Sequence, residues 1–121
     1  MVFTLHLLKI DVDGGELDVL KSGEMQIERF RPTLYFENDV QEKSAPLLDY
    51  AMRTLGYDLY FHRAPVFEPN NLFNNPDYHW RDTGVLSLMI VGIPREQKTP
   101  LNLKRVTSPE EWWDLTSADV I

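Results

Sequence analysis

The chain has 121 residues, 43% of them hydrophobic and 26% charged, which is typical of one soluble globular domain. The net charge of −7 argues against binding to nucleic acid or to an anionic membrane surface, because both require clustered Lys and Arg. The absence of cysteine excludes disulfides, thiolate metal sites and a cysteine nucleophile. The N-terminal sequence MVFTLHLLKID lacks the features of a signal peptide, and no stretch is apolar enough to span a membrane, so a cytoplasmic location is expected.

The first residues predict a strand, a turn and a helix. A strand is expected over residues 5–12, with aliphatic side chains on both faces, as in a parallel sheet covered on both sides. Gly14-Gly15 ends it, and a helix over residues 16–29 follows with acids in its first turn. Gly23 predicts close packing or an early break in this helix. Polar groups therefore gather at the C-terminal end of the strand, where open α/β sheets bind their ligands.

A second strand and helix follow the same plan. Aromatic and β-branched residues predict a strand over 33–38, which also ends in polar side chains. A helix is expected over residues 44–55, with Ser44 as N-cap and Pro46 in the first turn. Gly56 then suits the left-handed position that ends a helix.

The remainder predicts a hairpin and a tail. Strands are expected over 57–62 and 85–93, and the long segment 63–82 between them has the character of a binding loop. The order β-α-β-α-β-β gives two right-handed crossovers and then an antiparallel hairpin. Residues 1–94 would form the domain and residues 95–121 a tail, with a short helical turn at Ser108 and a tryptophan pair that packs as a lid or staple.

Three blocks in order, LLKIDVDGGELDVLKSG, FRPTLYFEND and LGYDLYFH, are similar to the C-terminal half of the FkbM family of methyltransferases. The family signature K-I-D-V-E-G-x-E has Asp13 here in place of glutamate. The resemblance implies a partial Rossmann-like class I methyltransferase sheet of about four strands, in the spatial order first, second, fourth, third. It also implies S-adenosylmethionine as the cofactor and a hydroxyl group of a sugar or natural product as the acceptor. The strands that hold most of the cofactor lie outside this half, and Gly14-Gly15 is not a G-x-G cofactor loop.

Acidic side chains follow the first two predicted strands. Such a cluster can hold a hydroxyl substrate, supply a general base or bind a hard divalent cation, but acids at a helix N-terminus can also be purely structural. The resemblance favours a role at the reaction centre for Asp11 and Glu16, the two acids that match the family motif. The predicted site residues are Asp11, Glu16 and His62 as catalytic groups, Asp11 and Asp13 at the cofactor, and Lys9, Glu37, Asn38 and Asp39 at the substrate, with no residue assigned to a metal.

These observations support two main hypotheses and a third, weaker one. The first is that the chain forms the acceptor-side half of an O-methyltransferase. The second is a non-catalytic fragment or split-enzyme subunit that acts as an interaction module, because the first strand would be an unpaired apolar edge that invites another chain. A homodimer or a complementing N-terminal half is the partner expected there. The third hypothesis is a small carboxylate–metal phosphohydrolase.

Overall fold

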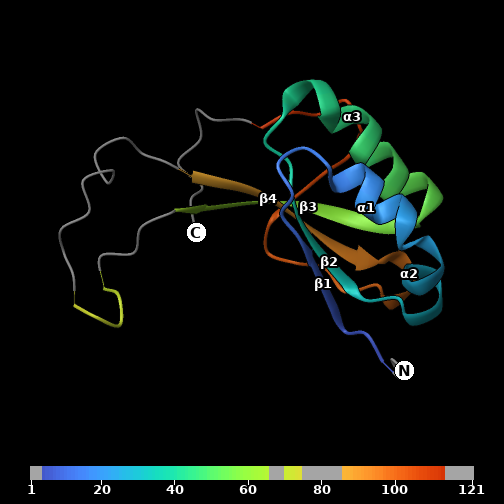
Figure 1. Cartoon of the computed structure of the whole chain (residues 1–121), viewed down its shortest axis with the longest axis horizontal. Coiled ribbons are helices and arrows are strands. Elements are labelled where there is room, and N and C mark those ends of the chain that lie inside the picture. Colours follow the sequence, from blue (N-terminus) through green and yellow to red (C-terminus); the bar gives the residue numbers. More distant parts are fainter. Residues whose placement is uncertain (1–3, 66–69, 75–85, 114–121) are drawn as a thin grey trace.

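The computed structural model describes residues 4–65, 70–74 and 86–113. Within them the chain is a mixed α/β domain with a five-stranded sheet in the order β1-β2-β4-β3-β5. Figure 1 shows the α-helices together on one side of this sheet. In chain order the elements are β1 (Leu7–Ile10), α1 (Glu16–Ser22), α2 (Glu24–Phe30), β2 (Thr33–Glu37), α3 (Gln41–Asp49), the π-helical turn η1 (Tyr50–Thr54), β3 (Tyr57–Pro65), β4 (Leu86–Pro94), the 3₁₀ turn η3 (Arg95–Gln97) and β5 (Lys104–Arg105).

The topology matches the predicted one and adds a strand. β1 and β2 are parallel, and β4 runs antiparallel between β2 and β3. The spatial order first, second, fourth, third is therefore confirmed, and β5 extends the sheet beyond β3. Gly92 in β4 permits the close packing of this centre, because an added Cβ would lie 3.2 Å from side-chain atoms of both Leu34 and Leu59.

The predicted first helix is broken, as Gly23 suggested. It divides into α1 and α2, and Gly23 is the residue between them. A Cβ added at Gly23 would be in contact with the Val19 carbonyl oxygen, at 3.4 Å. Strand β1 is shorter than predicted, because the chain turns soon after Ile10. The expectation that both faces of this strand are covered is wrong. Leu7 is 58% exposed, because α1, α2 and α3 all cover the opposite face of the sheet.

The start of the second helix also differs from the prediction. Helix α3 begins at Gln41 after Val40, so Ser44 is not its N-cap but is buried within it. Pro46 accordingly lies inside the helix rather than in its first turn. The C-terminal end is confirmed: after η1 the chain leaves the helix through Gly56, whose φ of +75° is in the left-handed region.

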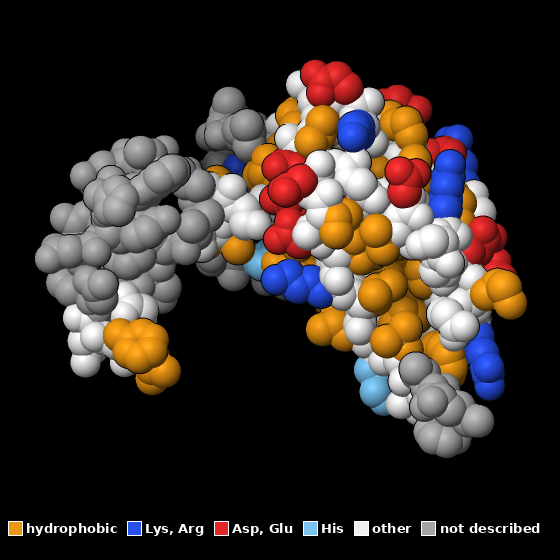
Figure 2. Space-filling view, in the orientation of Figure 1, with side chains coloured by type: hydrophobic (Ala, Val, Ile, Leu, Met, Phe, Trp, Pro, Cys, Tyr) orange, Lys and Arg blue, Asp and Glu red, His pale blue; other side chains and the backbone are white. Residues whose placement is uncertain are grey.

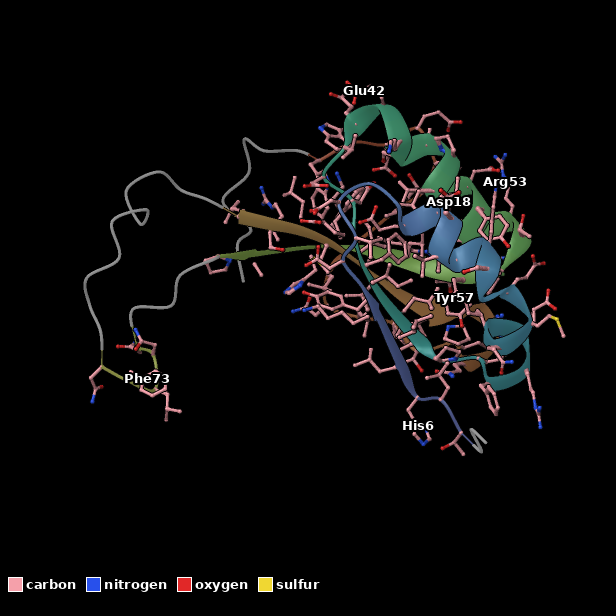
Figure 3. All side chains as sticks on the ribbon, in the orientation of Figure 1. His6, Asp18, Glu42, Arg53, Tyr57 and Phe73 are labelled. Atoms are coloured by element: carbon pink, nitrogen blue, oxygen red, sulfur yellow. The ribbon has the colours of Figure 1, made fainter. Side chains whose placement is uncertain are left out.

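The core lies between the helices and one face of the sheet. In β2, Leu34 and Phe36 are fully buried, whereas the alternating side chains are half-buried on the other face. Tyr57 is also fully buried and donates its hydroxyl hydrogen to the Pro32 carbonyl oxygen (2.7 Å). Figure 3 shows Tyr57 between sheet and helices, with Asp18, Glu42 and Arg53 on the outer surface of the helices.

The described part of the tail packs against the domain. Trp113 is 6% exposed and its ring lies edge-on to Phe61, with 4.7 Å between centroids, so this tryptophan packs as the predicted staple. The expected helical turn is a simpler turn, in which the Glu111 N–H donates to the Ser108 carbonyl oxygen (3.1 Å). Most of the predicted loop 63–82, including four of its aromatic residues (Phe67, Tyr78, His79 and Trp80), lies outside the described residues. The fifth, Phe73, is described and is 86% exposed.

Candidate functional site

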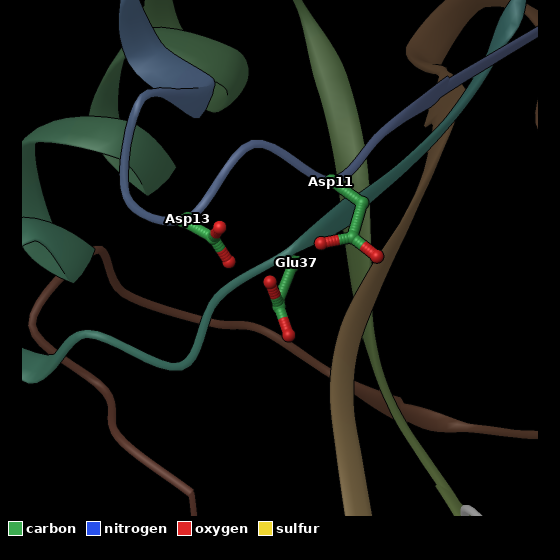
Figure 4. Close-up of side chains that lie close together, drawn as sticks. All are labelled: Asp11, Asp13 and Glu37. Carbon is green, nitrogen blue, oxygen red and sulfur yellow. The ribbon is translucent and has the colours of Figure 1, made fainter.

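Three acidic side chains gather where β1 and β2 end. Asp11 and Asp13 follow β1, and Glu37 is the last residue of the parallel neighbour β2. One carboxylate oxygen from each lies within 4.8 Å of the others, and Figure 4 shows Asp11 and Asp13 on either side of Glu37. Asp11 and Asp13 are exposed and Glu37 is half-buried. Such a spacing suits either a shared proton or a hard cation held by oxygen ligands.

The environment of Glu37 raises its pKa from 4.5 to about 7. Burial is the largest cause, because it disfavours the charged carboxylate. A hydrogen bond with Asp11 and the negative charges of Asp39, Asp11 and Glu16 raise the pKa further. The Glu37 carboxyl, which is hydrogen-bonded to Asp11, can therefore take up or release a proton near neutral pH.

Glu16 has a different environment, although the sequence grouped it with these acids. It is 3% exposed, and its Oε1 accepts hydrogen bonds from the backbone N–H of Val12 (3.1 Å) and Gly14 (3.4 Å). These bonds hold the turn between β1 and α1, in which Gly14 has a φ of +91°. The structure therefore gives Glu16 a structural role in this turn, and its predicted catalytic role stays a prediction.

Asn38 is also bound within the fold. It is 2% exposed, its Nδ2 donates to the Ser44 hydroxyl (3.0 Å), and its carbonyl oxygen accepts the Trp113 Nε1 hydrogen (2.8 Å). The polar atoms of Asn38 thus join β2 to α3 and to the tail. Asp39, the next residue, is exposed and acts on the acid pair through its charge. The predicted substrate contacts of both residues stay predictions.

Lys9 lies on the face of the sheet that carries the acid pair. It is opposite Tyr35 in the register of β1 and β2, two residues before Asp11, and its side chain is exposed. Its predicted contact with the substrate stays a prediction. A second lysine, Lys43 of α3, donates to the Gly14 carbonyl oxygen (3.0 Å) and so supports the turn.

His62 lies on this face as well, but with a partner that the sequence analysis missed. Its Nδ1 is 2.9 Å from the Tyr35 hydroxyl oxygen, and the ring centroids are 5.8 Å apart. In the register, His62 and Glu37 are both opposite Met89 of β4. The strict alternation of β2 puts Tyr35 on the same face as Glu37, which is the signal that could have identified it.

The described residues do not form a complete S-adenosylmethionine site. A cavity of about 250 Å³ lies between the turn, α1 and α3, which is below the roughly 300–1,000 Å³ of typical ligand pockets. The amides of the Gly14-Gly15 turn are already bonded, since the Gly15 N–H donates to the Val12 carbonyl oxygen (3.1 Å). The cavity is lined by Gly14, Glu16, Leu17, Asp18, Glu42, Lys43, Pro46 and Leu47, and so by neither member of the acid pair.

The sheet order and the acids at the ends of its parallel strands are compatible with a partial Rossmann-like fold of the methyltransferase type. Residues 3–59 match the family model described as the methyltransferase FkbM domain. This match confirms the FkbM resemblance over that segment and relates the chain to the methyltransferases, which in this family generally use S-adenosylmethionine. No curated protein and no solved structure matches the chain. Among the described residues, no helix has both the length and the apolar character needed to cross a bilayer.

Proposed function

We propose that this chain forms the acceptor side of an O-methyltransferase that acts on a hydroxyl group of a sugar or natural product. One observation carries the proposal. The family match covers the segment that brings Asp11 and Glu37 together, and the pKa of Glu37 is raised to about 7 there. A carboxylate with such a pKa is suited to accept a proton from a hydroxyl at neutral pH.

The chain's own residues would bind the acceptor and remove its proton. The acceptor hydroxyl donates to the Glu37 carboxylate, and its proton passes to Glu37 as the oxygen becomes the nucleophile. Once Glu37 holds this proton, its hydrogen bond with Asp11 retains it, and the charge of Asp39 helps to keep the Glu37 pKa high. Lys9 is placed beside the acids to contact the acceptor. S-adenosylmethionine would be held mainly by residues other than those that the structure describes.

The first experiment tests whether this chain binds the acceptor while a separate polypeptide binds the cofactor. The purified chain is titrated with S-adenosylmethionine by calorimetry, and then again after addition of an N-terminal half of an FkbM domain. We expect no saturable heat from the chain by itself, and saturable binding with methyl transfer to polyhydroxylated acceptors from the mixture. Saturable binding by the chain by itself would overturn the division.

A matched pair of variants then tests the proton acceptor. In the complemented mixture, Glu37→Gln should lower kcat at neutral pH by about 100-fold or more, as expected for the loss of a general base. The control Glu42→Gln removes an exposed acid on α3 and should leave kcat unchanged. Full activity of Glu37→Gln would contradict the proposed role.

A second candidate function, an interaction module, is favoured by the edge of β1. Among the described strands, β1 pairs with β2 on one side and with nothing on the other. The Thr33 N–H donates to the His6 carbonyl oxygen (2.9 Å), and a parallel ladder uses alternate residues, so the backbone groups of Leu7 and Lys9 point to the free edge. Figure 2 shows hydrophobic atoms at the surface along β1, below acidic side chains. We propose that β1 of a second copy of the chain pairs with this edge.

Proline substitution at the edge tests this pairing. Lys9→Pro removes an amide hydrogen that points away from β2, so it should block the added strand while the ladder between β1 and β2 is kept. Lys9→Ala is the control, because it removes the same side chain and retains the amide. Light scattering after size exclusion should give a dimer for the wild type and Lys9→Ala, and a monomer for Lys9→Pro. A monodisperse wild-type monomer at high concentration would refute the homodimer.

A further inference from the structure

Tyr35 and His62 form a hydrogen-bonded pair beside the acid pair. The 2.9 Å bond joins side chains of β2 and β3 across the intervening strand β4. Both side chains are half-buried, on the face of the sheet opposite the helices. Because Tyr35 is two residues before Glu37 in β2, the two pairs share this face.

The chemistry of the two groups sets the direction of this hydrogen bond. Burial raises the pKa of Tyr35 above its usual value of 10, so the phenol keeps its proton throughout the neutral range. A phenol O–H is a stronger acid than the N–H of a neutral imidazole, and the bare imidazole nitrogen is a stronger base than a phenol oxygen. The favoured arrangement therefore has Tyr35 as the donor and Nδ1 of His62 as the acceptor. In neutral His62 the single ring proton then resides on Nε2.

The register puts His62 within reach of a ligand held at Glu37. Glu37, Met89 and His62 occupy one row across β2, β4 and β3. Adjacent strands are about 4.8 Å apart, so the backbones of Glu37 and His62 are about 10 Å apart. Met89 lies between them and is 3% exposed. Protein atoms already cover Met89, so a hydroxylated ring that contacts the side chains at both ends of the row would lie above those atoms.

We propose that Tyr35 is a positioning residue that holds neutral His62 as the Nε2–H tautomer, so that His62 donates a hydrogen bond to a second oxygen of the acceptor while Glu37 takes the proton from the reacting hydroxyl. This inference rests on the proposed function for its substrate. It specifies the catalytic role predicted for His62 as that of a hydrogen-bond donor. It also narrows the acceptor class to rings that carry an oxygen beside the methylated hydroxyl.

The tautomer can be measured without any activity. Nitrogen-15 spectra of the histidine-labelled chain, recorded at about pH 9 where imidazoles are neutral, distinguish the two ring nitrogens. The His62 signals are assigned by their loss in His62→Gln. We expect the Nε2–H form in the wild type and a mixture of tautomers in Tyr35→Phe. Tyr50→Phe, which removes a phenol bonded to Glu24 on the helix side, should leave the His62 signals unchanged. A wild-type Nδ1–H form, or unchanged signals in Tyr35→Phe, would overturn the proposal.

A kinetic test then separates this proposal from the proposed function. In the complemented enzyme, Tyr35→Phe should raise KM about 10-fold for an acceptor with neighbouring oxygens and leave kcat within about twofold, because one binding hydrogen bond is weakened and the base is kept. An acceptor that lacks the second oxygen should show no such difference in KM. Equal KM changes for both acceptors would overturn the donor role of His62. Absence of methyl transfer from every mixture, with the expected tautomers in the spectra, would instead count against the proposed function.

Discussion

Two groups of carboxylates lie near the C-terminal ends of β1 and β2, and they differ in what they bind. Glu16 is buried and its oxygen accepts two backbone N–H groups of the turn. Asp11 and Glu37 are more exposed than Glu16 and bond to each other. Partial burial of Glu37, and then this bond, raise the pKa of Glu37 to about 7. A carboxylate that is fully paired with the backbone stabilises the fold, whereas a pair of acids that share a proton is costly for stability and available for chemistry.

This comparison shows that residue type and proximity do not identify a functional acid. The acids belong to one short motif and its neighbouring strand, and all carry the same functional group. Their roles are separated by their partners, since Glu16 accepts hydrogen bonds from backbone amides of the turn, whereas Glu37 bonds to a second acid. This difference between structural and reactive acids can be tested by substituting members of each group.

The largest effect is expected for Glu16→Ala. The substitution leaves the Val12 and Gly14 amides without their acceptor in a part-buried turn, which should lower the free energy of unfolding by about 2–3 kcal/mol. Urea denaturation followed by circular dichroism measures this change. The control Asp18→Ala removes an exposed acid from the same first turn of α1 and should cost less than about 1 kcal/mol. Equal losses in both variants would mean that Glu16 acts only through the helix dipole.

A smaller loss is expected for Asn38→Ala. It removes the bond from Nδ2 to the Ser44 hydroxyl and leaves that buried hydroxyl without this partner, so the free energy of unfolding should fall by about 1–2 kcal/mol. Asn102→Ala, at an exposed position of the tail, is the control and should be neutral in the same urea titration. A neutral Asn38→Ala would show that the buried amide adds nothing to the fold and would favour its predicted role at the substrate.

The sequence predicted the order of the elements because that order depends on local signals. Apolar runs, the break at Gly23 and the left-handed residue Gly56 are all readable from a few neighbouring residues. The start of α3 was missed because Ser44 has the composition of an N-cap, whereas its hydroxyl instead receives the hydrogen bond from Asn38.

The site was predictable only as a collection of side chains. The pairing of Tyr35 with His62 spans 27 residues, and that of Asn38 with Trp113 spans 75, so neither leaves a local pattern. The sequence placed Asp11 and Glu37 at neighbouring strand ends correctly, since parallel strands bring their C-terminal ends to one edge. It could not distinguish them from Glu16, because burial and hydrogen-bond partners depend on the folded turn.

For Glu37, unlike Glu16, we expect a substitution to increase the stability of the folded chain. Because the pKa of Glu37 is higher in the folded chain (about 7) than the ordinary 4.5, the folded state binds this proton more tightly. The contribution of Glu37 is therefore most favourable below about pH 4.5 and is lost as the pH rises to about 7. Glu37→Gln should remove this pH dependence, and at pH 8 the variant should be about 1 kcal/mol more stable than the wild type. Urea titrations of both proteins at about pH 5 and pH 8 measure the free energy of unfolding and its pH dependence. Glu42→Gln should keep the wild-type dependence, and an unchanged slope in Glu37→Gln would contradict the shared proton.

The smallest effect is expected at Asp13, which tests whether the acids form a pair or a larger unit. Asp13 is exposed and has a φ of +51°, a conformation that glycine adopts at lower cost. Asp13→Gly should therefore change the free energy of unfolding by only a few tenths of a kcal/mol, since the relief of strain is offset by the greater freedom of the unfolded chain. The pKa of Glu37 is raised by burial, Asp11, Asp39 and Glu16, so Asp13→Gly should keep the difference in stability between pH 5 and pH 8 that Asp11→Asn reduces. If Asp13→Gly reduced it as much as Asp11→Asn does, the proton would be shared by three acids, and Asp13 would belong with the reactive carboxylates rather than with the turn.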